Sequence, residues 1–273
     1  MRPDFSDLKI DVVDNQKTTQ TETQDLGIDP DNKPMKKGFS EEDISDAEHL
    51  NFAAGFPPYT RGNYSTMYIT NPLKTDKHNS GTEIKNNFSK EEQTSIVLKL
   101  AYSLAKGKEH INDKLELGIK IDEIASEIYF SCRVSNNFFM EIAKLRAARM
   151  IWAKIVNQFN PKKQESMMMH IHSETSKLDS KEKDYLDNIT KTSLEAMSAI
   201  FGGTESLDSS YNIVQHIENE TNITKAIDPW AGSYYIEFLT KQIAKDTWTI
   251  ISEIENIGDT TKALETRLHK INY

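Results

Sequence analysis

Three side chains that are common metal ligands alternate along one short segment of the chain. His170, His172 and Glu174 are spaced two residues apart, and this spacing places all three on one face of a β-strand. Imidazole nitrogens and carboxylate oxygens bind zinc and iron, so the segment could serve a small metal-dependent hydrolase. Because no fourth ligand is apparent, we favour a polar patch along the strand and expect no bound metal.

A second candidate for metal chemistry is residues 76–81, Asp-Lys-His-Asn-Ser-Gly, which satisfy the pattern D-x-H-x-x-G. In cobalamin proteins the His of this pattern replaces the lower ligand of the cobalt, and the Asp orients the other ring nitrogen. The Ser-x-Leu and Gly-Gly that accompany the pattern do not follow Gly81. We therefore favour a polar junction loop over a cobalt ligand at His78.

The remaining reactive or charged candidates are best explained by packing. Lys144, Arg146, Arg149 and Lys154 form a basic edge on one predicted helix, and we expect their aliphatic parts to cover neighbouring apolar surface. Cys132 is the one cysteine, and we expect it to fill the core. A single cysteine excludes an internal disulfide and fits a reducing compartment, so we expect a cytoplasmic protein.

Charge and hydropathy argue against two classes of partner. The formal net charge is −9, and no basic block of the kind that binds a phosphate backbone is present. The sequence has no run of about 18 apolar residues, the length that a helix needs to span a membrane. The acidic residues near its start do not fit a signal peptide. We expect neither nucleic acid nor a membrane as a partner.

Hydropathy patterns predict the elements that must position these residues. Apolar residues recur with helical period over residues 91–115, 137–160, 184–201 and 236–257. Short apolar runs predict strands at Tyr129–Val134, Met167–His172 and Thr204–Leu207. Strands that alternate with long helices are typical of an α/β fold with a parallel sheet.

The number of these units indicates an incomplete barrel. A full (β/α)8 TIM-type barrel needs about 250 residues, and the stretch with regular patterns is shorter than that. Residues 1–50 are polar and contain hardly any apolar clusters, so they cannot offset their own ordering entropy. We predict an extended N-terminal arm over residues 1–50 and a partial barrel domain over residues 51–273.

Several longer segments resemble the catalytic barrel of the methylmalonyl-CoA mutase family, and they occur in the same order. Those segments are NFAAGFPPYTRGNYSTMY (51–68), AYSLAKGKEHINDKLELGIKIDEIA (101–125), NFFMEIAKLRAARMIWAKIVNQFNPK (137–162), HSETS (172–176), EAMSAIFGGTESL (195–207) and DPWAGSYYIE (228–237). Together they cover well over half of the chain.

The resemblance implies a barrel that holds the CoA chain of an acyl-CoA along its axis. It also implies that adenosylcobalamin, bound by a separate domain above the carboxyl ends of the strands, supplies the radical for the isomerase reaction. The family's Tyr-x-Thr-Met motif, which contacts CoA, is similar to Tyr64, Thr66 and Met67 here. These three residues are therefore identified as a CoA-binding remnant.

Other family positions are changed or missing. By resemblance His172, Glu174, Asp208 and Ser210 are the cofactor-facing remnant, but the family has Gln, His and Asn at the last three positions. Only 28 residues lie between Pro72 and Ala101, where the family has several strands, including the one with the catalytic His. We assign no catalytic residue and expect that this chain alone does not bind adenosylcobalamin.

Three hypotheses for the function follow from these residues. We favour a barrel domain of the mutase family that is non-catalytic alone and acts as a subunit or as a decayed paralogue, because some features resemble the family's small subunit. The first alternative is a functional acyl-CoA mutase component completed by another chain. The second is the metal-dependent hydrolase. We expect association with a mutase subunit or with itself, weakened by deletion of residues 1–50.

Overall fold

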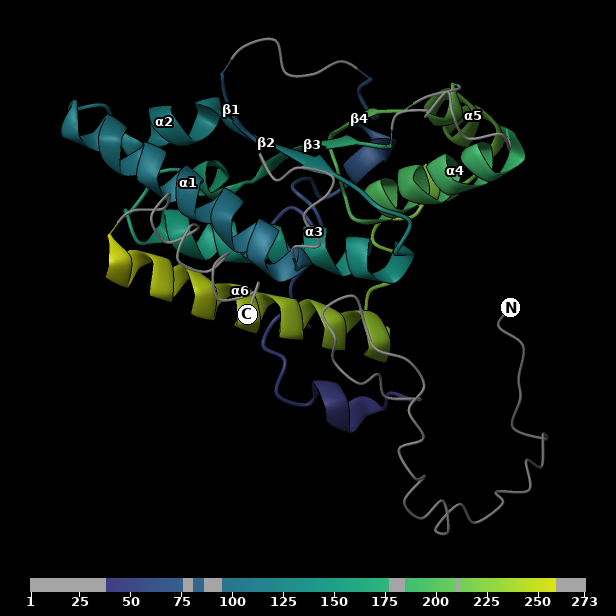
Figure 1. The fold of residues 1–273 in the computed structure, drawn as a ribbon, viewed down its shortest axis with the longest axis horizontal. Coiled ribbons are helices and arrows are strands. Elements are labelled where there is room, and N and C mark those ends of the chain that lie inside the picture. Colours follow the sequence, from purple (N-terminus) through teal and green to yellow (C-terminus); the bar gives the residue numbers. More distant parts are fainter. Residues whose placement is uncertain (1–37, 76–80, 86–94, 177–184, 210–211, 259–273) are drawn as a thin grey trace, which may run out of the picture. The chain divides into compact units, whose positions relative to one another are not determined.

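A computed structural model describes residues 38–75, 81–85, 95–176, 185–209 and 212–258. Four strands form one parallel sheet in the order β1–β2–β3–β4, as Figure 1 shows. They are β1 (Thr82–Lys85), β2 (Ile128–Arg133), β3 (His170–Glu174) and β4 (Ser206–Asp208). Beyond β4, Lys74 makes one more parallel bridge, to Ser206. Strands were predicted near β2, β3 and β4, whereas no strand was predicted at β1.

Helices connect each strand to the next and account for about half of the described residues. They are α1 (Ile96–Glu116), α2 (Ile121–Glu127), α3 (Phe138–Asn157), α4 (Tyr185–Phe201), α5 (Ile213–Glu220) and α6 (Tyr234–Ile257). The four long helices were predicted from their periodicity. Helix α6 ends at Gly258, which has a left-handed φ of +77° that only glycine adopts without strain.

Neighbouring strands follow one another along the chain, and helical segments connect them. Crossovers of this kind are right-handed, so a sheet built in one direction carries its connecting helices on one face. Residue burial agrees, because Phe130, Ile171 and Leu207 each belong to a hydrophobic cluster that includes helix residues. A singly wound parallel sheet is compatible with part of a barrel, and the four described strands do not close one.

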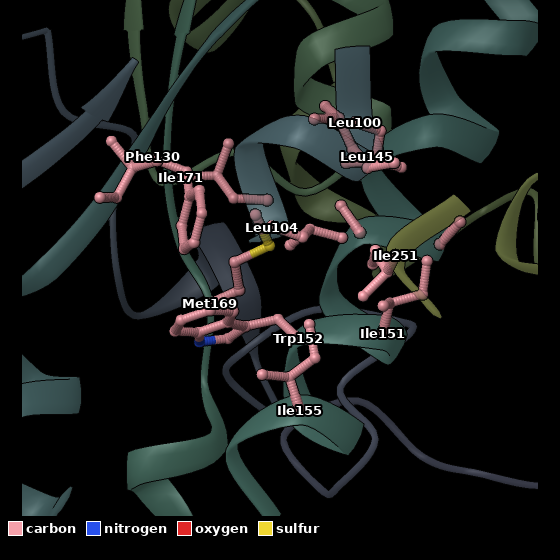
Figure 2. Packing of buried hydrophobic residues seen from close by; sticks show 14 of the residues in the cluster. Leu100, Leu104, Phe130, Leu145, Ile151, Trp152, Ile155, Met169, Ile171 and Ile251 are labelled. Carbon is pink, nitrogen blue, oxygen red and sulfur yellow. The ribbon is translucent and has the colours of Figure 1, made fainter. Parts of the chain in front are cut away.

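The main hydrophobic core lies between the sheet and helices α1, α3 and α6. Trp152 of α3 is 1% exposed, and its ring meets Phe130 of β2 edge-on with the ring centroids 4.8 Å apart. Figure 2 shows Leu104, Met169 and Ile155 around the same indole ring. Helix α6, yellow in Figure 1, runs along α1 and α3. This core fixes α3 against the sheet.

Residues 39–50 belong to the compact unit that begins at Phe39. The Phe39 ring packs on Tyr235 and Phe238 of α6, with centroids 4.9 and 5.0 Å away. Residues 1–37, most of the predicted arm, lie outside the described residues. The domain boundary at residue 50 therefore stays a prediction. None of the described helices is long and apolar enough to cross a bilayer.

Candidate functional site

The polar face of the sheet carries the residues that the sequence singled out on β3. In the strand register His172 lies between Ser131 of β2 and Ser206 of β4. The His172 Nδ1 atom is 2.7 Å from the Ser206 hydroxyl, and the Ser131 hydroxyl donates to Glu174 over 3.2 Å. His172 is 1% exposed. The predicted alternation is therefore correct, and these side chains hydrogen-bond across the strands.

His170 begins the same face at the amino end of β3. Its Nδ1 atom lies 2.9 Å from a carboxylate oxygen of Glu205, which precedes β4. Burial by itself lowers the pKa of His170, but the hydrogen bond and charge of Glu205 outweigh it and raise the pKa above its usual value. Asn63 donates its amide to the same carboxylate and to the Met169 carbonyl. The sequence analysis missed Glu205 and Asn63, because no pattern of spacing in the sequence links either residue to His170.

The predicted CoA-binding remnant lies near the amino ends of β3 and β4. Tyr68, one residue beyond the motif, donates its hydroxyl to the Thr204 carbonyl over 2.6 Å. Burial, together with the charge of Glu205, raises the pKa of Tyr64 to about 12. Met67 is buried and has a positive φ of 42°, and the hydroxyl of Thr66 bonds that of Thr70.

Arg149 of α3 holds this segment in place. Its guanidinium donates to the carbonyls of Tyr59 (2.9 Å), Thr60 (3.0 Å) and Gly203 (3.2 Å). Burial and the neighbouring Arg146 lower its pKa to about 10, so it stays charged at neutral pH. The expectation that Arg149 lies along the surface is wrong, because its side chain is 1% exposed. The Tyr59 carbonyl also accepts the Gly62 amide over 3.0 Å, so Arg149 gives it a second donor and gives the Thr60 and Gly203 carbonyls a charged one.

Arg146 likewise lies in the interior, within a network of charges. It pairs with Asp228 and donates to Glu237 of α6 over 2.7 Å. His49 Nε2 is 2.7 Å from the other Glu237 oxygen, and the Gly232 amide donates to Glu237 over 2.9 Å. The expected surface position of Arg146 is therefore also wrong. The network ties residues near His49 to α3 and α6.

The other two basic residues of that edge lie nearer the surface. The Lys154 ammonium sits 4.0 Å from the centroid of the Trp248 ring, which is the packing expected for a long cationic side chain. Lys144 pairs with Glu141 one turn earlier in α3 and donates to the Arg133 carbonyl over 3.2 Å. The basic edge is therefore split between two buried arginines and two peripheral lysines.

The two sets of predicted site residues occupy opposite ends of the strands. Tyr64, Thr66 and Met67 belong to the segment at the amino ends, whereas Glu174 and Asp208 are the last residues of β3 and β4. The Asp208 carbonyl accepts the amide of Thr175 over 2.9 Å. Ser210 and His78 lie outside the described residues, so their predicted roles stay predictions.

The residues at the carboxyl ends do not fit the cofactor that the resemblance implies. Glu174 and Asp208 carry carboxylates, which only accept hydrogen bonds when ionised. A Gln at the Glu174 position could both donate to and accept from the amide groups of a corrin ring, and Glu174 cannot. His172 is enclosed and bonded to Ser206. Within the described ranges no three His, Cys, Asp or Glu side chains are placed to hold a metal ion.

Comparisons with known proteins point to one family. The family model described as methylmalonyl-CoA mutase matches residues 77–272. The chain is 40% identical over 193 residues to methylmalonyl-CoA mutase of Rhizobium meliloti, covering 64% of this chain and 27% of that protein. It is 37% identical over 193 residues to the human mitochondrial methylmalonyl-CoA mutase, covering 64% of this chain and 26% of that protein. It is 36% identical over 224 residues to the methylmalonyl-CoA mutase large subunit of Streptomyces virginiae, covering 76% of this chain and 30% of that protein. The chain thus spans between a quarter and a third of the length of these relatives.

Proposed function

Because the chain belongs to the methylmalonyl-CoA mutase family, we propose that it is a shortened mutase-type barrel domain that is non-catalytic alone. It acts as a subunit, or as a decayed paralogue, in a complex with a mutase chain or with another copy of itself. The proposal includes a polar arm over residues 1–50, a barrel domain over residues 51–273 and a cytoplasmic location. This chain alone does not bind adenosylcobalamin, the cofactor that the family resemblance implies; where that cofactor and acyl-CoA take part, a mutase chain in the complex holds them.

The observation that carries this proposal is the short connection between the two edges of the sheet. Lys74 bridges to β4 at one edge, and β1, which begins at Thr82, forms the other edge. Only seven residues, 75–81, connect them. A complete barrel closes its sheet with eight strands sealed on both sides by hydrogen bonds. Seven residues are too few to supply the missing strands with their crossover helices.

Side-chain chemistry supports the lack of independent activity. The carboxyl ends of β3 and β4, where a barrel enzyme places its catalytic groups, end in the carboxylates Glu174 and Asp208. Their negative charges repel an anion, and an ionised carboxylate has no hydrogen-bond donor to offer to the oxygen of an amide. The chain therefore lacks the cofactor-facing groups of the family at the described positions.

The alternative, an acyl-CoA mutase component completed by another chain, is favoured by one specific feature. Tyr64 and Met67 are kept at the amino ends of the strands, anchored through Tyr68, Asn63 and Arg149. The resemblance assigns Tyr64 and Met67 to CoA and places the cofactor above the opposite, carboxyl ends of the strands. The hydrolase alternative has no such support, since His170 and His172 are bonded to Glu205 and Ser206.

Titration with adenosylcobalamin, followed by its visible spectrum, tests the proposal. We expect no saturable change with the full chain at micromolar concentration, and no isomerisation of methylmalonyl-CoA. A saturable change in the spectrum would contradict the first expectation. If His78→Ala abolished that change, His78 would be assigned as the cobalt ligand. Turnover by the chain alone would refute the proposal. Turnover that appears only after a mutase subunit is added would favour the alternative.

Light scattering and sedimentation test the association. We expect an oligomer, or a complex with a mutase chain, at micromolar concentration. Because Phe39 and His49 contact α6, deletion of residues 1–37 is a sharper test of the arm than deletion of residues 1–50. A monodisperse monomer that melts cooperatively and ignores added mutase chain would overturn this part.

A further inference from the structure

Strand β1 lies at the edge of the sheet (Figure 1). It pairs with β2 on one side, through the register Thr82–Ile128 to Lys85–Ser131. On its other side no strand pairs with it among residues 38–75, 81–85, 95–176, 185–209 and 212–258. An edge strand presents alternate backbone N–H and C=O groups that can pair with another chain. The open edge is therefore a potential interface.

The side chains of β1 differ between its two faces. Ile84 faces the main core and is 8% exposed. Glu83 and Lys85 point to the opposite, polar face, where their charged groups lie 3.0 Å apart. The Lys85 side chain is 55% exposed, and that of Glu83 is 20% exposed. The strand thus has one acid and one base, placed symmetrically about a central apolar residue.

We propose that β1 pairs antiparallel with β1 of a second copy of this chain, about a two-fold axis at Ile84. In that register Glu83 of each copy lies opposite Lys85 of the other, on the same face of the joined sheet. Opposite charges at directly opposed positions stabilise an antiparallel pair, and like charges destabilise it. A parallel in-register pair would instead set Glu83 against Glu83 and Lys85 against Lys85. The charge pattern therefore selects the antiparallel, self-complementary arrangement, which closes as a dimer.

This inference deepens the proposed function and rests on its requirement for association, for which it names the surface and the partner. Charges on an edge strand can also protect it from pairing. The two roles make opposite predictions. If the charges protect the edge, their reversal changes nothing or promotes association. If they align two copies, single reversals weaken the dimer and the double reversal restores it.

The test measures self-association of the full chain by sedimentation equilibrium. Glu83→Lys places two Lys–Lys contacts in the dimer, and Lys85→Glu places two Glu–Glu contacts. We expect each variant to raise the dissociation constant at least about tenfold. The double variant Glu83→Lys/Lys85→Glu should return to near the wild-type constant. An equimolar mixture of the two single variants should form a heterodimer, since every opposed pair is then complementary.

Matched controls separate this effect from net charge and from folding. Glu116→Lys and Lys225→Glu make the same changes in charge at exposed positions on other elements, and both should leave the dissociation constant unchanged. Thermal melts of all variants should agree within a few degrees.

The inference is overturned if neither single reversal changes the dissociation constant, or if the double reversal does not restore it. Either result leaves the proposed function standing. A wild-type monomer overturns the inference, whereas binding to a mutase chain tests the proposed function separately.

Discussion

The buried network around Glu237 makes a quantitative prediction about stability and pH. Burial by itself raises the pKa of Glu237, but the hydrogen bond from His49, the charge of Arg146 and the amide of Gly232 lower it from 4.5 to about 2. A carboxyl group whose pKa falls this far on folding stabilises the native state by about 3 kcal/mol at neutral pH. Glu237→Gln keeps the shape of the side chain but removes its charge.

We expect Glu237→Gln to lower the free energy of unfolding by about 3 kcal/mol at pH 7. The folded pKa lies below the unfolded pKa, so the contribution is complete above pH 4.5 and is lost as the pH falls towards 2. The difference between wild type and variant should therefore shrink steadily between pH 5 and pH 3. Urea denaturation followed by circular dichroism at pH 7, 5, 4 and 3 measures it.

The matched control is Glu116→Gln, which removes an exposed carboxylate at the end of α1. It should change the free energy of unfolding by less than about 0.5 kcal/mol at every pH. A difference below about 1 kcal/mol for Glu237→Gln at pH 7 would refute the reasoning. A difference that stays constant from pH 5 to pH 3 would refute it equally, because the loss would then come from packing and not from charge.

Three further predictions concern α3, the turn before β4 and the polar face of β3. Gly203→Ala should lower the melting temperature by several degrees, because φ is +80° and a Cβ would lie 3.0 Å from the Arg149 guanidinium. Arg149→Lys should destabilise the fold by about 2 kcal/mol in urea, since one ammonium cannot reproduce three guanidinium contacts; wild-type stability would contradict the anchoring role. After purification without chelator, mass spectrometry should find no stoichiometric zinc, iron or cobalt, and a 1:1 metal that disappears in His172→Ala would show that this expectation is wrong.

Local patterns in the sequence were sufficient to predict the long helices and three of the four strands. Helices α3 and α6 bury a continuous apolar stripe, and such a stripe repeats with a period that is visible in the sequence. The alternation of His170, His172 and Glu174 correctly predicted their common face, because side chains on any strand alternate between its faces. Strand β1 was missed because a run of only four residues, with charges at Glu83 and Lys85, carries no such signal.

The partners of the buried charged groups were decided by the tertiary structure alone. Arg146 binds Asp228 and Glu237, which lie 82 and 91 residues further along the chain, and Arg149 binds the Tyr59 carbonyl, 90 residues before it. In the sequence both arginines resemble surface residues of an amphipathic helix. A buried charge is tolerated only where distant groups converge to pair with it. That convergence depends on how the helices and the segment before β1 pack together, so the sequence determined the elements and the packing determined which polar residues hold them.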